Sequence, residues 1–228
     1  MSFRQSIKKI IPKGLLNLRH LWYAWYGSRK YGRPSEKLLV IGVTGTSGKS
    51  TTVFMLRQLL ESAGFKVGSL STIDFHIAGE NKLNDQKMTM LGKMQIQKYL
   101  REMVDKDCEI AILETTSEGA VQYRNRCINY DIMILTNLYP EHIESHGSFE
   151  NYKKAKLGIF RRASTGRRKV LTNPKFESLH SDGSGEIEKI AMVNGDIAES
   201  EEFLGAGWFG SWLVFGKTEK TNTLMKKK

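Results

Sequence analysis

The sequence predicts an α/β fold with a mostly parallel sheet and helices on both faces. Short apolar runs, typical of strands buried on both sides, alternate along the chain with segments whose apolar residues recur at helical spacing. One of these strands leads through a glycine-containing loop into a helix, and two later strands are each followed by a polar residue. Such alternation favours parallel pairing, because the helices connect successive strands across the faces of the sheet.

The organising element of the chain covers residues 38–52. An apolar strand from Leu38 to Val43 leads into a loop that contains Gly45 and Gly48, and an amphipathic helix begins at Lys49. Glycines allow a tight turn whose backbone N–H groups point inward. A strand, a glycine loop, a lysine–serine pair and a helix in this order form the layout of a phosphate-binding loop.

This loop has the chemistry needed to hold a nucleotide. Backbone N–H groups and the start of a helix bind phosphate oxygens, Lys49 supplies a cation near the β- and γ-phosphates, and the Ser50 hydroxyl can bind Mg²⁺. The common pattern has its first glycine where this chain has Val43. The alternative is a glycine-rich turn with an incidental lysine, but the flanking strand and helix favour a nucleotide site. We therefore expect a nucleotide and Mg²⁺ as ligands, with Gly45, Thr46, Ser47, Gly48, Lys49, Ser50 and Thr51 around the nucleotide; ATP as that nucleotide is what the family resemblance described below implies.

Composition narrows the class of protein. The net charge is +11, and residues 1–37 carry nine basic residues against one acidic residue, so most of the excess charge precedes the loop. A general nucleic-acid surface is therefore not predicted, while a mildly basic remainder suits an anionic substrate. The two cysteines, Cys108 and Cys127, are too few for a disulfide framework, which favours a reducing, cytoplasmic compartment.

The N-terminal segment, residues 1–35, is basic and aromatic. Its large apolar side chains at helical spacing are Leu18, Leu21, Trp22, Trp25 and Tyr26. One interpretation is a helix that lies on anionic lipid, which would give a weak membrane-surface contact through residues 1–30 at the inner face of the membrane. The alternative, which we favour slightly, is a helix that packs on the domain with its lysines in solvent.

The remaining elements follow in order along the chain. We expect strands at 65–70, 109–114, 131–136 and 213–215, a loop or short hairpin at 74–92, and helices around 96–104 and from 148 onward. Glu114 and Asn137 come at the ends of two of these strands. Because ligands collect beyond the carboxyl ends of parallel strands, we expect both residues to lie beside the glycine loop.

Three segments carry a resemblance to a known family. Residues 42–52, Gly-Val-Thr-Gly-Thr-Ser-Gly-Lys-Ser-Thr-Thr, resemble the central ATPase domain of the Mur ligases, most closely the UDP-N-acetylmuramoyl-tripeptide synthetase type. Residues 114–124 resemble the family's segment after its metal-binding glutamate, and residues 136–147 resemble its Thr-Asn-Leu and His-Gly motifs. The resemblance implies a central ATP-binding domain at 36–220 and a basic tail at 221–228, without the family's N-terminal UDP-binding and C-terminal ligase domains.

The resemblance also implies roles for individual residues. Glu114 would be a metal ligand, Asn137 would lie at the nucleotide, and His142 would bind a second metal. The residues that would contact the UDP-sugar substrate are Thr89, Thr116, Gln122 and Arg124. The chain departs from the family pattern at Met88, Glu118, Glu141 and Glu144. Taken alone, His142 and His146 could be a zinc pair or ordinary loop histidines, and we do not predict zinc.

Lys156 shares an apolar helical face with Tyr152, whereas Lys153 and Lys154 point away. A lysine on such a face is usually a stem whose amine reaches solvent, and the alternative is a buried amine with a lowered pKa. The resemblance places the family's carbamylated lysine at Lys156, as a catalytic and metal-binding group alongside Lys49 and His142.

The resemblance implies an enzyme of peptidoglycan precursor synthesis. It would be an ATP-dependent amide ligase that forms an acyl phosphate on a UDP-N-acetylmuramoyl peptide and then joins it to an amino acid. One alternative is a nucleotide-binding partner or regulatory module without complete ligase activity, and a separate ligase-domain partner would fit either case. Another alternative is a ligase similar to folylpolyglutamate synthase.

Overall fold

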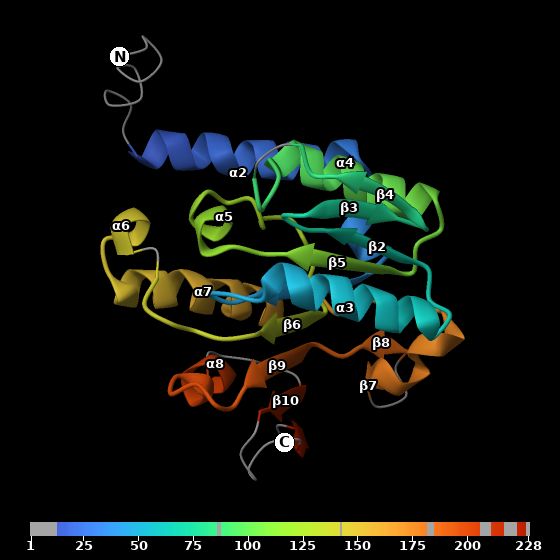
Figure 1. Ribbon diagram of the computed structural model, residues 1–228. Helices are drawn as coiled ribbons and strands as arrows, with labels where there is room; N and C mark the ends of the chain where they lie inside the picture. Colours follow the sequence, from blue (N-terminus) through green and yellow to red (C-terminus); the bar gives the residue numbers. More distant parts are fainter. Residues whose placement is uncertain are drawn as a thin grey trace.

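The computed structural model describes residues 13–85, 88–141, 143–181, 185–205, 211–216 and 223–226. Its centre is a nine-stranded sheet with the order β11-β10-β9-β6-β1-β5-β2-β3-β4 (Figure 1). The strands of this sheet are β1 (Leu39–Thr44), β2 (Val67–Leu70), β3 (Asp74–Ile77), β4 (Glu80–Leu83), β5 (Ile110–Glu114), β6 (Ile132–Leu135), β9 (Ile190–Asn194), β10 (Ser211–Phe215) and β11 (Thr223–Lys226). Strands β7 (His180–Ser181) and β8 (Glu186–Ile187) form a separate pair.

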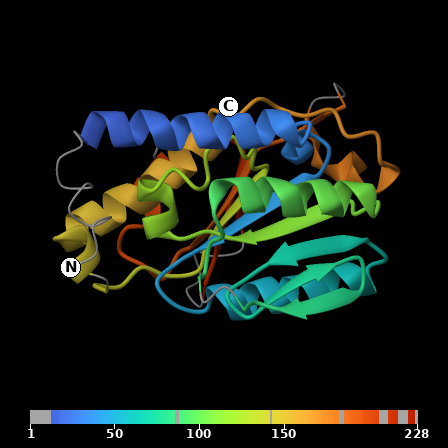
Figure 2. The same cartoon turned by 90° about the horizontal axis from the view of Figure 1, so that it is seen from above.

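Helices connect most of these strands. The α-helices are α2 (Lys13–Lys30), α3 (Lys49–Ser62), α4 (Lys93–Asp105), α5 (Ser117–Val121), α6 (Ile143–His146), α7 (Phe149–Ser164) and α8 (Ser200–Gly205). Two 3₁₀ helices, η1 (Pro34–Glu36) and η2 (Pro174–Leu179), complete the described elements. Figure 2 separates the layers, with α3 on one side of the strands and α2, α4 and α7 on the other.

The sheet is parallel at its centre and antiparallel at its edges. Strands β10, β9, β6, β1, β5 and β2 run parallel in that spatial order. The hairpin of β3 and β4 extends one edge antiparallel to β2, and β11 extends the other edge antiparallel to β10. The predicted α/β class with a mostly parallel sheet is therefore confirmed, and the polar stretch at 74–92 contains the short hairpin.

Strand β1 is central because both of its faces are buried. Leu38, just before the strand, and Val40 belong to the core under α4 and α7, while Leu39, Ile41 and Val43 belong to the core under α3. Successive side chains of a strand point to opposite faces, so a continuous apolar run supplies both cores. This arrangement fixes the strand that leads into the glycine loop.

A fully buried ionic cluster lies at the amino end of β6. The Asp131 carboxylate accepts hydrogen bonds from the Val40 backbone N–H at 2.8 Å, from Lys169 Nζ, and from Lys189 Nζ at 3.1 Å. The three charged side chains are at most 1% exposed. Burial lowers the pKa of Lys169 to about 8, although Asp131 opposes this shift. The cluster joins β1, β6 and the segment before β9 at the end of the sheet away from the glycine loop.

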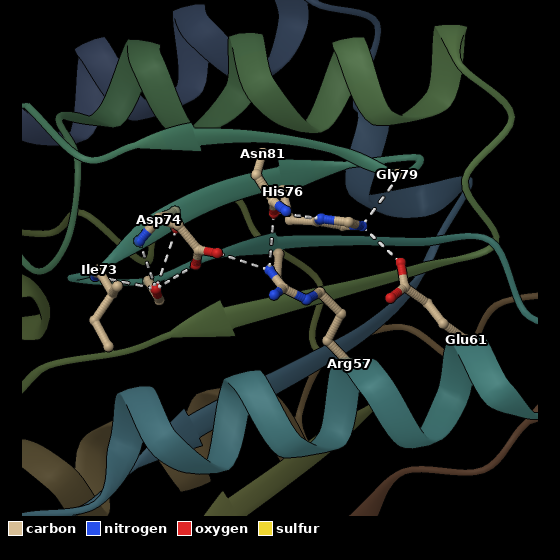
Figure 3. A network of polar contacts seen from close by, with 9 residues as sticks. Arg57, Glu61, Ile73, Asp74, His76, Gly79 and Asn81 are labelled. Carbon is tan, nitrogen blue, oxygen red and sulfur yellow. Dashed lines mark hydrogen bonds and ion pairs between the residues drawn. The ribbon is translucent and has the colours of Figure 1, made fainter.

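A second polar network holds the edge hairpin against α3 (Figure 3). Arg57 of α3 is 5% exposed, and its guanidinium donates to Asp74 Oδ2 at 2.9 Å and to Asn81 Oδ1 at 3.4 Å. His76 lies between the Asn81 amide at 2.7 Å and the Glu61 carboxylate at 2.6 Å. One helix thus carries the glycine loop at its start and anchors the sheet edge along its later turns.

Helix α2 packs on the domain through small residues instead of aromatic ones. Ala24, Gly27 and Ser28 are buried, and a Cβ atom on Gly27 would collide with Met94 of α4. Most of the large apolar side chains face outward, with Trp22 53% exposed, whereas Leu21 is half-buried. No helix in the described part of the chain combines the length and the apolar composition needed to span a bilayer. Contact of this aromatic surface with a membrane stays a prediction.

Replacing Asp131 with Asn should destabilise the fold by about 3–5 kcal/mol, because two buried lysines would lose their counter-charge. The matched control is Asp105→Asn, which removes an exposed carboxylate paired with Arg101 on the surface of α4. Its free energy of unfolding should be nearly unchanged. Urea denaturation of both variants measures the difference, and equal small losses would show that the cluster contributes little.

Candidate nucleotide site

The glycine loop presents the start of α3 to solvent. Gly48 adopts a left-handed backbone with φ of 75°, and the first intrahelical bond runs from the Thr52 N–H to the Gly48 carbonyl at 2.9 Å. The N–H groups of Lys49, Ser50 and Thr51 therefore precede the hydrogen-bonded turns of the helix. A Cβ atom on Gly48 would meet no atom within 4 Å, so the space before these donors is open. Converging donors at a helix start fit an anion such as phosphate.

The end of β6 supports the loop from behind. A Cβ atom on Gly45 would collide with the Thr136 hydroxyl, so only glycine fits at this position. The Asn137 amide oxygen accepts hydrogen bonds from the Thr46 N–H at 3.0 Å and the Ser47 N–H at 2.9 Å. Its amide nitrogen donates to the Ser47 carbonyl at 3.1 Å. Asn137 therefore holds the loop in shape through its backbone.

Two lysine amines converge on one backbone carbonyl. Lys49 Nζ donates to the carbonyls of Gly45 at 3.1 Å and Thr46 at 2.8 Å, and Lys156 Nζ donates to the same Gly45 carbonyl at 2.8 Å. Lys156 is 1% exposed, and its amine lies 4.6 Å from the centre of the Tyr152 ring. Burial, with the nearby Lys49 charge, lowers the pKa of Lys156 to about 7. Burial also lowers the pKa of Lys49, against the opposing charge of Glu114.

Glu114 is the buried carboxylate beside the glycine loop. The parallel register pairs Val43 of β1 with Glu114 of β5, which brings the acid beside the loop. Glu114 is 3% exposed, and its Oε2 accepts hydrogen bonds from Ser50 Oγ at 2.9 Å, the Thr72 N–H at 2.8 Å and Thr72 Oγ1 at 2.9 Å. Sequence reasoning missed Thr72, although it follows β2, and β2 ends at the same edge of the sheet as β5.

A cavity of about 490 Å³ opens in front of these groups and unites the loop, the acid and the buried lysine. Eight of the predicted site residues line it: Gly45, Lys49, Ser50, Thr89, Glu114, Thr116, Arg124 and Lys156. Sequence reasoning assigned no site role to four other polar lining residues, Thr72, Ser117, Glu118 and Tyr152. Ser117 is held by a contact of 3.1 Å with the His146 ring, so the helix start at α5 joins the histidine of α6.

Other predicted residues lie outside the cavity lining. Gln122 is exposed and accepts hydrogen bonds from Arg124 at 2.7 and 3.0 Å, so its contact with the cavity is indirect. Asn137 contacts the loop backbone, as described above. Thr46, Ser47, Gly48 and Thr51 belong to the loop and the first helical turn. His142 lies outside the described residues.

The donor set around Glu114 consists of oxygens. Within the described residues, no group of three or more His, Cys, Asp or Glu side chains could form a metal cage of its own. Mg²⁺ commonly uses one or two carboxylates together with substrate phosphates and water. Glu114 with the Ser50 and Thr72 hydroxyls fits a magnesium ion held jointly with a phosphate.

Comparisons with known proteins agree with this geometry. The family model described as the Mur ligase middle domain matches residues 43–200. The chain is 34% identical over 201 residues to the UDP-N-acetylmuramoyl-L-alanyl-D-glutamate–2,6-diaminopimelate ligase of Chlamydia felis, covering 88% of this chain and 36% of that protein. It is 32% identical over 180 residues to a UDP-N-acetylmuramyl-tripeptide synthetase of Roseiflexus, covering 77% and 33%. The chain thus spans about a third of the length of the curated relatives it matches.

Solved structures show the same fold. A UDP-N-acetylmuramoyl-L-alanyl-D-glutamate–2,6-diaminopimelate ligase superposes with a TM-score of 0.63 at 24% identity, covering 82% of this chain and 33% of that one. A Mycobacterium tuberculosis folylpolyglutamate synthase superposes with a TM-score of 0.61 at 14% identity, covering 88% and 47%. The matched residues 43–200 fall inside the predicted domain at 36–220, whose exact limits stay a prediction.

Proposed function

Because the chain belongs to the Mur ligase family through the middle domain of that family, we propose that it binds ATP and carries the phosphoryl-transfer site of an amide ligase. The observation that carries the proposal is one cavity that unites an open helix start, Lys49 and the Glu114 carboxylate. Phosphoryl transfer depends on positioning and charge stabilisation, which these groups supply.

The roles follow from the contacts. The loop N–H groups and the Lys49 amine hold phosphate oxygens, while Asn137 keeps the loop in the binding conformation. Ser50 and Glu114 would hold Mg²⁺, which offsets negative charge on the phosphates when bound. Thr72 orients the Glu114 carboxylate through two hydrogen bonds. His142 remains the proposed ligand of a second metal.

The relatives' names support the substrate class. We propose a UDP-N-acetylmuramoyl peptide as acceptor, with Thr89, Thr116 and Arg124 facing it in the cavity and Gln122 orienting Arg124. A carboxylate oxygen of this acceptor attacks the γ-phosphorus, so an oxygen–phosphorus bond forms and the phosphorus–oxygen bond to ADP breaks. The amine of an amino acid then attacks the acyl carbon, so a carbon–nitrogen bond forms, the amine loses a proton and phosphate leaves. Since the named relatives are about three times as long as the matched stretch, amide formation needs polypeptide beyond the middle domain, in one chain or in a partner.

Lys156 is the proposed carbamate. The amine attacks CO₂, an N–C bond forms, one C–O π bond opens and a proton leaves, so a cation becomes an anion. Burial supports this step, because a pKa of about 7 leaves much of the amine neutral at neutral pH. A carbamate anion at this position suits a site that would hold a magnesium ion, whereas a second ammonium group beside Lys49 would repel the magnesium ion.

Replacing Lys49 with Ala should weaken Mg-ATP binding about tenfold or more, because a charge-assisted contact is worth about 1.5–3 kcal/mol. Calorimetric titration measures the affinity. Lys66→Ala is the matched control, since Lys66 is exposed near the amino end of β2, opposite the loop. Equal affinities in the wild type and Lys49→Ala would exclude the assignment. If the middle domain binds ATP, and the protein with the further ligase polypeptide present still forms no amide, the regulatory-module alternative is favoured.

Carbamylation can be observed directly by ¹³C NMR after equilibration with ¹³C-bicarbonate. We expect a carbamate resonance in the wild type and in Lys154→Ala, whose lysine is exposed on the same helix, and none in Lys156→Ala. The resonance should grow between pH 6 and 8, because the amine loses its proton as pH rises through a pKa of about 7. A signal that persists in Lys156→Ala would assign the carbamate elsewhere.

A further inference from the structure

A second cavity, of about 640 Å³, lies outside the nucleotide site. It is an open groove lined by α2, by α5 and the segment that follows it, and by α7, and it shares no lining residue with the cavity at the glycine loop. Figure 2 shows α2 and α7 on the same side of the sheet. Its lining includes Asn17, Gln122, Asn125, Arg126, Lys154 and Arg162. We refer to it as the α2–α7 groove.

The α2–α7 groove is positively charged without a balancing acid. Arg126, Lys154 and Arg162 line it, and no carboxylate does so among the described residues. None of these three side chains forms an ion pair in the described part of the chain. Burial and the neighbouring Arg126 charge lower the pKa of Arg162, so two guanidinium groups are held together partly out of water. Two neighbouring positive charges repel each other, and an anion bound between them in the groove would relieve this repulsion.

Two polar atoms of this segment have no hydrogen-bond partner. Asn125 is 1% exposed, and its Oδ1 is buried without a partner, as is the Nε atom of Arg126. Both atoms are shut off from solvent, so a ligand in the groove would contact Asn125 and Arg126 through their other side-chain atoms.

We propose that the α2–α7 groove binds a phosphate ligand with two or more negative charges, such as a diphosphate. Guanidinium groups match phosphate oxygens in a bidentate manner, and three cations exceed what a single carboxylate would neutralise. The volume lies within the range of small-molecule sites. The shared chemistry is the diphosphate group, and its sources are free pyrophosphate or a nucleoside diphosphate. The inference does not rest on the proposed function, because it uses none of the loop residues.

The test is calorimetric titration with inorganic pyrophosphate in the Lys49→Ala background, which weakens competition from the glycine loop. Pyrophosphate should bind this variant, and adding Arg162→Gln should weaken the affinity tenfold or more. The matched control adds Arg161→Gln, which removes the same charge from the next residue of α7, where the side chain is exposed. That control should change the affinity less than twofold. Equal effects of the two arginines, or no binding at all, would overturn the proposal.

A second variant guards against misfolding. Asn125→Asp keeps the side-chain shape but adds a carboxylate beside Arg126, so pyrophosphate binding should fall tenfold or more while the cooperative melting transition is retained. Unchanged binding in a folded Asn125→Asp protein contradicts the site. Parallel titrations with UDP and uridine identify the source of the diphosphate. Tighter binding of UDP than of pyrophosphate supports a nucleotide, equal binding supports the free anion, and uridine binding equal to UDP contradicts a phosphate site.

Discussion

The parallel register of β1 against its two neighbours determines where Glu114 and Asn137 lie relative to the glycine loop. Pairing of Val43 with Glu114 on one side and of Thr44 with Leu135 on the other brings an acid and the Asn137 amide to the same loop. A shift of one residue would turn alternate side chains to the opposite face and separate Ser50 from Glu114. The buried cluster at Asp131, at the far end of β6, contributes to this register because it bonds the backbone of β1 directly.

Charge gives the site its preference for anions. Three cationic side chains and an open helix start face two carboxylates in the cavity lining, and burial strengthens these interactions relative to water. The α2–α7 groove also carries more positive than negative charge, and it lies on the other side of the segment from Gly119 to Arg126. Its positive charge comes from arginine and lysine side chains, without a glycine loop. Gln122 lines the α2–α7 groove and accepts hydrogen bonds from Arg124, which lines the cavity at the glycine loop.

Much of the fold and part of the site could be predicted from the sequence. The central strands, the glycine loop and Glu114 follow from apolar runs and from the rule that parallel strands end together. Lys156 follows from its apolar helical face together with the family resemblance. The position of Gln122 could not be predicted from the sequence, because α5 is one short turn and its side-chain directions depend on tertiary contacts. The packing of α2 was also hidden, since its contact face consists of Ala24, Gly27 and Ser28, while large aromatic residues dominate the sequence pattern. Thr72 could have been found by applying the strand-end rule to β2 as well.

The central claim is that the glycine loop, with Glu114, is the nucleotide phosphate site. A crystal structure with Mg²⁺ and a non-hydrolysable ATP analogue tests it most directly. The account predicts phosphate oxygens within hydrogen-bond distance of the Lys49 amine and the N–H groups at the start of α3, with the metal bound by Ser50 and Glu114. Phosphates bound elsewhere, for example between Arg126 and Arg162, with the loop empty at saturating analogue, would contradict it.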